Sequence, residues 1–474
     1  MLFNSIEFLF FFPIVTILYF LIPHQIRWLH LLISSCIFYA AFIPEYILIL
    51  FATIIIDYFA GIQLGKDYST QRKKCILLLS LIANIGILAI FKYYNFFIEN
   101  YNQFFNLLGI QAIHRIPHWD LILPIGLSFH TFQAMSYTIE VYRGNQKPER
   151  HFGIYALYVM FYPQLVAGPI ERPQNVLHQF HEYHPFNANK FWNGIRLMLW
   201  GLFKKVVIAD RLAIYVNHFY QNPDQSPAIN LFMATLFFTI QIYCDFSGYS
   251  DMALGAAESM GFNLMINFKR PYQATDIQEF WGRWHISLST WFRDYLYIPL
   301  GGKKKGELRK YFNVAVVFIL SGFWHGANWT FLVWGFIHAL GNSFTMFWKS
   351  FKRPITIPIF PQLLTITFVA VAWIFFRADS LSNAWIVFSK IGSFSDYSFN
   401  TIFPFVDGIQ YGRKWHLFVL LLVLFMYFLE KYSDERLYVL NKKPILDLAF
   451  SILILTFCIC LGVFNKSSFI YFQF

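Results

Sequence analysis

The amino-acid sequence predicts an all-α polytopic membrane protein, and three observations lead to that prediction. Of the 474 residues, 57% are hydrophobic and 13% are charged, and that charged fraction is about half of what is usual for a soluble domain. The mean hydropathy is +0.46, on the apolar side of zero. Apolar runs close to the length that spans a bilayer recur from the first residues to the last, so we expect successive hydrophobic helices to organise the chain.

Thirteen apolar segments are candidate spans, and because several are short or interrupted we expect about eleven to thirteen to cross the membrane. The whole chain, 1–474, is treated as a single transmembrane domain with its central catalytic region at about 121–348. The first run has no basic n-region and no cleavage site, which favours a retained helix over a cleaved signal. The candidate segments are 6–22, 29–43, 45–61, 75–91, 121–142, 153–168, 194–217, 228–250, 311–326, 328–348, 361–376, 415–430 and 445–464.

The net charge of +11 does not require a nucleic-acid partner, because the basic residues gather in short loops between the candidate spans. This distribution is typical of cytoplasmic loops that obey the positive-inside rule. Counting spans from the basic loops 66–74 and 303–310 also places 349–353 and 430–443 in the cytoplasm. It leaves both termini and the stretch 377–414 outside, so we expect a bilayer-embedded protein without a nucleic-acid partner.

Neither a metal site nor a redox site is predicted. The five cysteines lie mostly inside apolar stretches, which favours packing over metal binding or redox chemistry. His178, His181 and His184 follow one another at intervals of three. Steps of three wind around a helix, so this spacing favours an interfacial loop over a metal site.

Two stretches forty residues apart each place one histidine among tryptophans. The first runs from Trp281 to Pro299 and contains His285. Asp276 and Glu279 have the spacing of an N-cap and its capping-box partner, so we expect one amphipathic helix that ends near Pro299. His285 and Trp281 would share its aromatic face. Such a segment is too polar to cross lipid alone and suits a re-entrant or interfacial helix beside a water-filled cavity.

The second histidine, His325, lies near the end of the candidate span 311–326. Fourteen residues at the helical rise carry it about 21 Å inward from Tyr311. Gly322 and Gly326 flank it, so the helix can break or be approached closely there. A desolvated, neutral imidazole at this depth can take a proton from a hydroxyl or thiol that attacks an acyl thioester. A hydrogen-bonded core histidine is the structural alternative.

Four further polar residues are candidates. Asp245 and Asp251 lie inside an apolar run, where ionisable groups are expensive and face a cavity or a partner. They are six residues apart and do not stack on one helical face, so we expect them to satisfy buried partners or line a cavity. Arg293 could bind the phosphates of a donor while Asp294 orders the loop, or the two could form a structural ion pair.

The stretches 284–302 and 321–329 together resemble the membrane-bound O-acyltransferase (MBOAT) family. Within it, the chain resembles most the branch that O-acetylates extracytoplasmic polysaccharides such as alginate and peptidoglycan. The segments 123–133, 166–172, 243–251 and 469–474 fit the same branch, so the resemblance covers nearly the whole chain.

The resemblance assigns roles to individual positions. His325 matches the catalytic histidine of the family, and His285 matches its second active-site position, which is often asparagine or aspartate in eukaryotic relatives. The residues expected to line the substrate passage around them are Trp284, Ser289, Arg293, Asp294, Trp324, Asn328, Asp245 and Asp251.

The resemblance also implies an activity. The chain would move an acetyl group from cytoplasmic acetyl-CoA, with no bound cofactor, to a periplasmic O-acetyltransferase partner or to the polysaccharide itself, in the bacterial inner membrane. His325 would act as a general base or carry the acetyl group covalently. D-alanyl transfer from a carrier-protein thioester to teichoic acid is a second enzymatic hypothesis. A transporter or channel, in which the two histidines relay protons, is the non-enzymatic one.

Overall fold

The computed structural model describes residues 1–109, 116–119, 121–166, 168–351, 359–393, 397, 405–406, 409–410, 412–432, 444–464 and 470. Parts of four segments that were assigned to one side of the membrane therefore lie outside the described residues, namely Lys352 and Arg353, much of 394–411 within the stretch 377–414, most of 430–443, and the tail apart from Ile470. Ala167 and Phe469, which belong to the matching motifs, lie outside them as well.

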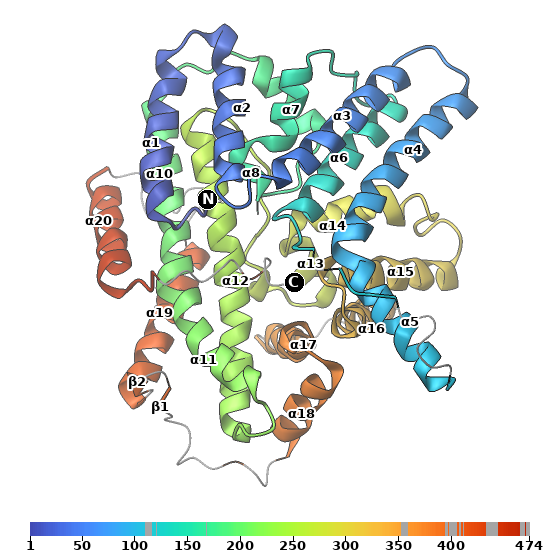
Figure 1. Cartoon of the computed structure of the whole chain (residues 1–474). Helices are drawn as coiled ribbons and strands as arrows, with labels where there is room; N and C mark the ends of the chain where they lie inside the picture. The colour runs from blue at the N-terminus through green and yellow to red at the C-terminus, as the bar shows by residue number, and fades with distance from the viewer. Residues whose placement is uncertain are drawn as a thin grey trace. The chain divides into compact units, whose positions relative to one another are not determined.

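The regular secondary structure of the described residues is almost all helical, which confirms the predicted all-α class (Figure 1). The exception is a pair of two-residue antiparallel strands, β1 (Phe405–Val406) and β2 (Ile409–Gln410). The first ten α-helices are α1 (Ile6–Leu21), α2 (His24–Ala40), α3 (Tyr46–Leu64), α4 (Thr70–Leu88), α5 (Tyr94–Leu107), α6 (Leu127–Tyr142), α7 (Phe152–Met160), α8 (Tyr162–Leu165), α9 (Pro173–Val176) and α10 (Ala188–Leu202). The others are α11 (Asp210–Gln221), α12 (Ala228–Ser259), α13 (Ile277–Arg283), α14 (Ile286–Phe292), α15 (Glu307–His325), α16 (Trp329–Ser350), α17 (Phe360–Arg377), α18 (Leu381–Gly392), α19 (Arg413–Tyr432) and α20 (Pro444–Leu461).

Short segments of altered helical winding join several of these helices. Those with π-type winding are η1 (Ala89–Tyr93), η3 (Phe203–Ala209) and η5 (Arg293–Tyr297). Those with 3-10 winding are η2 (Leu177–His181) and η4 (Pro271–Gln273). The segments η3 and η5 both lie close to predicted site residues, and local π winding inside helices occurs frequently at functional sites.

The chain divides into two compact units. The first comprises 1–194 and 256–265, and the second comprises 195–255 and 266–474. Both histidine stretches belong to the second unit. This division concerns packing within the chain, and the assignment of 1–474 to one transmembrane domain stays a prediction.

Several helices have the length and composition to cross a bilayer. Among the described residues, four segments meet both requirements, and two shorter apolar helices accompany them. Each of the six overlaps a span predicted from the sequence, and the polytopic class is confirmed, while the total of eleven to thirteen spans stays a prediction. The four are Tyr46–Leu64, Thr70–Leu107, Ala228–Ser259 and Phe360–Arg377, and the shorter two are Ile6–Leu21 and Asp447–Leu461.

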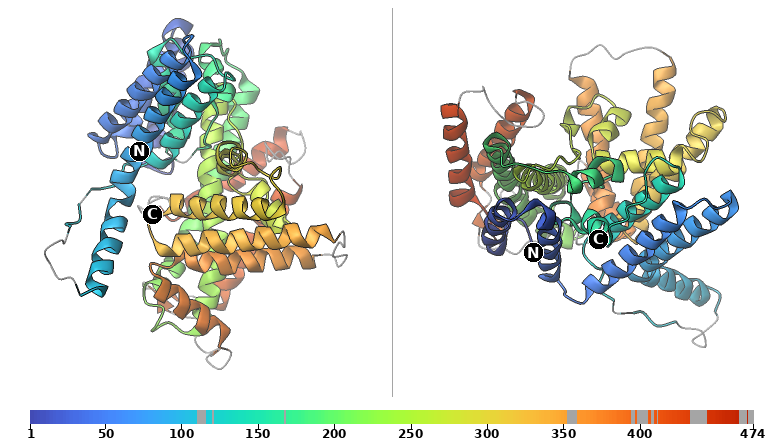
Figure 2. Two further views of the ribbon diagram at one scale, coloured as in Figure 1. Left: turned by 90° about the vertical axis from the view of Figure 1, so that its right-hand side faces the viewer. Right: turned by 90° about the horizontal axis from the view of Figure 1, so that it is seen from above.

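Helices α15 and α16 form the antiparallel pair that carries His325, and they lie side by side (Figure 2). The 19 residues of α15 give it a length of about 28 Å. Glycines let the two backbones approach closely. A Cβ atom on Gly322 would lie 2.2 Å from the carbonyl oxygen of Phe331, and one on Gly335 would lie 2.3 Å from that of Phe318. Small residues serve this purpose in membrane helix pairs, where close backbone packing drives association.

A methyl group at Gly322 should therefore separate the pair. We expect Gly322→Ala to destabilise the protein by about 1–3 kcal/mol, the usual cost of overpacking, because the obstructing atom is backbone and cannot rotate away. The measurement is the thermal unfolding midpoint of the detergent-solubilised protein. Gly86→Ala in α4 is the matched control, since a Cβ atom there would have no neighbour within 4 Å. Equal midpoints for the two variants would contradict the close approach.

Candidate active site

The two histidines that the sequence singled out lie next to each other. The ring centres of His285 and His325 are 6.3 Å apart, and the ring planes are inclined by 56°. Both side chains are buried, with exposed fractions of 0% and 3%. Two positions that are forty residues apart in the sequence thus form one buried imidazole pair.

His285 occupies a break between two short helices, where we expected a single helix. The predicted beginning is confirmed, because the Asp276 side chain accepts from the Glu279 backbone N–H at 2.9 Å and the Glu279 carboxylate accepts from the Thr275 N–H at 2.7 Å. The predicted continuation to Pro299 is wrong. Residue 284 is extended, and His285 has φ 44° and ψ 53°. His285 and Trp281 therefore do not share a helical face.

The left-handed backbone of His285 is unusual for a residue other than glycine. It costs an L-residue about 1–2 kcal/mol, and such strain persists only where the surroundings hold it, which is frequently at functional sites. At this break, the helix that the sequence pattern predicts as continuous is interrupted. Because α13 stops at Arg283 and α14 starts at Ile286, the histidine is presented by a helix–break–helix segment instead of by the side of a helix.

Asn267 holds this break in place. Its backbone carbonyl accepts from the Ile286 N–H at 2.9 Å, and its side-chain oxygen accepts from the Ser287 hydroxyl at 2.6 Å. Its amide nitrogen donates to the hydroxyl of Ser250 on α12 at 3.2 Å. The Asn267 side chain is 1% exposed. One buried residue thus ties the first turn of α14, directly after His285, to the long helix α12.

His325 is the last residue of α15. The helix ends there because Gly326 is extended, with φ −159° and ψ 147°. Aromatic rings surround the imidazole, and the ring centres of Trp334 and Phe376 lie 5.2 Å and 5.4 Å from it. The carbonyl end of a helix carries a partial negative charge. A positive charge that develops on His325 would therefore be stabilised by the end of α15.

A single side chain, that of Trp324, contacts both imidazoles. Its ring centre lies 5.0 Å from that of His325 and 6.2 Å from that of His285. Phe246 of α12 packs on His285 from another direction, at 4.7 Å and 88°. The pair is thus enclosed by aromatic rings, in surroundings that strengthen any electrostatic interaction made there.

Asp245 and Asp251 belong to a buried charge network on α12. The Lys205 ammonium lies 2.5 Å from Asp245 Oδ1 and 2.8 Å from Asp210 Oδ1. The Lys204 ammonium lies 2.6 Å from Asp251 Oδ2. The two lysines follow each other in η3; Lys204 pairs with Asp251, and Lys205 is shared by Asp245 and Asp210. The arrangement agrees with the expectation that the aspartates satisfy buried partners.

The network connects to the aromatic surroundings of the site. The Tyr243 hydroxyl donates to Glu430 Oε1 at 2.8 Å, and the Lys204 ammonium lies 5.6 Å from the centre of the Tyr243 ring. That ring is 6.2 Å from the ring of Trp284, the neighbour of His285. The Asp245 carboxylate also accepts from the backbone N–H of Ile470 at 2.8 Å, so the network holds a residue of the chain's last segment.

We expect Lys205→Met to destabilise the protein by about 3–5 kcal/mol, because it leaves two carboxylates buried and uncompensated. Asp245→Asn should cost clearly less, since Lys205 keeps Asp210 as a partner at 2.8 Å. Thermal unfolding of the purified protein in detergent compares the two variants. A Lys205→Met protein as stable as Asp245→Asn would contradict the shared-lysine arrangement.

The remaining predicted lining residues occupy varied positions. Trp284 is 1% exposed and stacks on Phe280 at 5.5 Å, so it belongs to the core beneath His285. The Ser289 hydroxyl donates to the Trp284 carbonyl oxygen at 3.3 Å. Asn328 caps α16, because its side chain accepts from the Thr330 N–H at 3.0 Å. A role of these three residues in a passage stays a prediction.

Arg293 and Asp294 form an ion pair, which is one of the two alternatives raised for them. Their Nε and Oδ1 atoms are 2.8 Å apart, with side chains 59% and 30% exposed. Exposed pairs of this kind contribute about 0–1 kcal/mol to stability, so this pair leaves the guanidinium available to other anions.

The sequence analysis missed Lys204, Lys205 and His338. Both lysines fall inside the candidate span 194–217. Their charge within an apolar run is the signal by which they could have been identified. His338 is fully buried and accepts from Trp281 Nε1 through Nδ1 at 3.2 Å. Its position nine residues into α16 gave no signal beyond proximity in sequence. Asn267 lies between elements and had no pattern to mark it.

The fold and the site define the chain as a polytopic all-α membrane protein with a buried histidine pair, and comparison with known proteins supplies the family. The profile of the membrane-bound O-acyltransferase family, MBOAT, matches residues 33–388. The chain belongs to this family. It is therefore an O-acyltransferase embedded in a membrane, and family membership favours the enzyme over the transporter or channel considered above.

Relatives with curated names are similar over most of the chain. The probable alginate O-acetylase AlgI of Pseudomonas aeruginosa is 36% identical over 450 residues, covering 92% of this chain and 83% of the relative. The peptidoglycan O-acetyltransferase of Helicobacter pylori is 36% identical over 419 residues, covering 81% and 78%. The teichoic acid D-alanyltransferase of Streptococcus thermophilus is 29% identical over 248 residues, which cover 49% of this chain and 59% of the relative.

Proposed function

We propose that this enzyme transfers an acetyl group from cytoplasmic acetyl-CoA to a hydroxyl group of an extracytoplasmic polysaccharide, directly or through a periplasmic partner protein, in the bacterial inner membrane. The observation that carries the proposal is the buried pair of His285 and His325, 6.3 Å apart, one at a strained break and the other at a helix end. The names of the two relatives that match most of this chain, an alginate O-acetylase and a peptidoglycan O-acetyltransferase, support acetyl as the group and a polysaccharide as the acceptor.

The proposed chemistry starts with neutral His325. One of its ring nitrogens takes the proton of the accepting hydroxyl as the oxygen attacks the carbonyl carbon of the thioester. The C–S bond then breaks, the acetyl ester forms, and the leaving CoA thiolate receives the proton. The imidazolium that exists between these steps lies at the carbonyl end of α15, where the helix dipole favours a positive charge.

His285 has a supporting role in this proposal. The side chain of Trp324 contacts both the His285 ring and the His325 ring. The two residues that follow His285, Ile286 and Ser287, are held by Asn267. A residue fixed in this way can orient the acyl carbonyl or the acceptor next to the base, which is how positioning contributes to rate. The lining roles of Trp284, Ser289, Arg293, Asp294, Trp324, Asn328, Asp245 and Asp251 remain part of the proposal.

The donor can be tested with isolated membranes that contain the enzyme and its acceptor. Labelled acetyl-CoA and a labelled D-alanyl carrier-protein thioester are supplied separately, and label in the polysaccharide fraction is counted. We expect label from acetyl-CoA only. Label from the D-alanyl thioester alone would overturn the proposed donor and favour the activity for which the Streptococcus thermophilus relative is named.

The general-base route is distinguishable from a covalent acetyl-histidine. Purified enzyme is mixed with labelled acetyl-CoA without acceptor, quenched, and examined for protein-bound label. The general-base route predicts no stoichiometric label on the protein, whereas a label that maps to His325 would establish the covalent route.

A further inference from the structure

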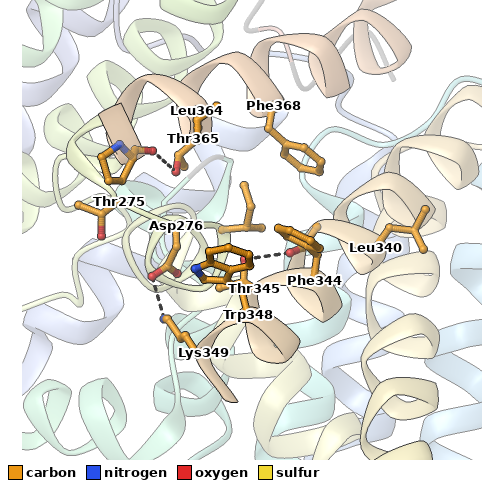
Figure 3. A pocket seen from close by; sticks show the side chains of 13 residues that line it. Thr275, Asp276, Leu340, Phe344, Thr345, Trp348, Lys349, Leu364, Thr365 and Phe368 are labelled. Carbon is orange, nitrogen blue, oxygen red and sulfur yellow. Dashed lines mark hydrogen bonds and ion pairs between the residues drawn. The ribbon is translucent and has the colours of Figure 1, made fainter. Parts of the chain in front are cut away.

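A cavity of about 1020 Å³ lies away from the two histidines, between the second half of α16, the first half of α17 and the residues that lead into α13 (Figure 3). Its volume is at the upper end of the range of about 300–1,000 Å³ that is usual for small-molecule sites. Its walls are mainly apolar and include Leu340, Phe344, Leu364 and Phe368. A two-carbon acyl group would not need a chamber of this size.

One end of the cavity carries opposite charges. The Lys349 ammonium lies 2.7 Å from Asp276 Oδ2, and Figure 3 shows the two side chains meeting below the apolar walls. The side chains are 51% and 23% exposed, so a ligand can reach both. Lys349 also donates to the Gln278 side-chain oxygen at 3.2 Å. The cavity is thus apolar along its walls and carries a cation and an anion side by side at one end.

The sequence around the charged end favours a position at a membrane boundary. Lys349 and Trp348 are near the end of α16, and α17 begins at Phe360 after a connection that contains Lys352 and Arg353. Basic residues in a short connection indicate the cytoplasmic side, and tryptophan is enriched at the headgroup level. With this placement the cavity would extend from the headgroup region toward the apolar layer.

We propose that this cavity binds a zwitterionic phospholipid with a primary ammonium headgroup, such as phosphatidylethanolamine. The lipid phosphate pairs with Lys349, the ammonium pairs with Asp276, and an acyl chain fills the space between α16 and α17. The two charges of this ion pair then each meet the complementary charge of one headgroup.

Asp276 is the residue that gives the site its selectivity. A lipid chain gains little from leaving other lipid for an apolar cavity, because the bilayer interior is as apolar as leucine. The headgroup must therefore supply the preference. An anionic headgroup, or the phosphates of a nucleotide donor, would meet the Asp276 carboxylate 2.7 Å from the cation that attracts them, and like charges disfavour binding. A quaternary ammonium lacks N–H groups to donate to that carboxylate.

The test is lipid binding to the purified full-length protein in detergent, measured by native mass spectrometry. Phosphatidylethanolamine, phosphatidylglycerol and phosphatidylcholine are supplied in equal amounts. We expect the wild type to retain phosphatidylethanolamine at least about fivefold over each of the other two. Asp276→Asn should lose that preference and gain phosphatidylglycerol, because Lys349 remains. The variant keeps the N-cap of α13, since asparagine caps as well as aspartate.

Two further variants complete the test. Thr345→Phe places a ring in the cavity, where Thr345 is a lining residue that is 7% exposed, and it should reduce retention of all three lipids. Lys303→Gln removes an exposed charge elsewhere and should leave the preference unchanged. An Asp276→Asn protein with the wild-type preference would overturn the headgroup assignment. Equal lipid retention by Thr345→Phe and the wild type would show only annular lipid and overturn the cavity assignment.

Discussion

Replacing His325 with alanine is expected to abolish acetylation of the acceptor polysaccharide while the amount of protein in the membrane stays the same. A positioned general base contributes about 10²–10⁴-fold to a rate, so the loss should be at least of that order. The side chain is 3% exposed but lies at the end of α15 and not in its middle. Alanine can occupy a helix terminus, and a folded, inactive protein is the expected result.

The matched control is another buried histidine of the same unit. His338 lies within α16, is fully buried and accepts from Trp281 Nε1 through Nδ1 at 3.2 Å. His338→Asn keeps a side-chain acceptor for that hydrogen bond, so it should retain most of the activity. Acetyl content of the polysaccharide and membrane levels of each variant are the measurements. Normal acetylation by His325→Ala would remove the proposed base.

Substitutions of His285 are expected to distinguish the contribution of its left-handed backbone from the contribution of its imidazole ring. Glycine accepts the left-handed conformation without strain, asparagine tolerates it, and alanine pays about 1–2 kcal/mol for it. If His285 supports His325 by holding a hydrogen-bonding side chain in place at the break, activity should fall in the order His285→Asn, His285→Gly, His285→Ala. The alanine variant should also be the least stable, since φ is 44° at this position.

Two outcomes would contradict the supporting role. Equal activity and stability of His285→Ala and His285→Gly would mean that the strained backbone contributes nothing. A His285→Asn protein as inactive as His285→Ala would mean that the imidazole itself is required. Activity is measured as polysaccharide acetylation, and stability as the unfolding midpoint of each purified variant.

The sequence predicts where the helices of the site lie better than it predicts where they are interrupted. The candidate spans 311–326 and 328–348 correspond closely to α15 and α16, because glycines and a basic loop mark their ends. The segment 276–299 has helical periodicity on both sides of His285, and periodicity is insensitive to one left-handed residue. The break depends on Asn267, which contacts residues 286 and 287 across about twenty positions of chain, and no local pattern records such a contact.

Proximity of His285 and His325 was predictable only through the resemblance to the family. Their separation of forty residues says nothing about distance, and the structure supplies the 6.3 Å. The buried charge network differs, because some of its residues can be identified from the sequence. Lys204 and Lys205 are visible in the sequence as intramembrane charges, but their partners Asp251 and Asp245 are identified only by the packing of η3 against α12.

The most direct test of the account uses the purified enzyme in liposomes with labelled acetyl-CoA and a polysaccharide acceptor. Release of CoA thiol and transfer of label are followed together for the wild type and for His325→Ala. The account predicts acceptor-dependent release of thiol, with label in the acceptor, by the wild type and a loss of both in the variant. Equal turnover by the two proteins would contradict the claim that acyl transfer takes place at His325.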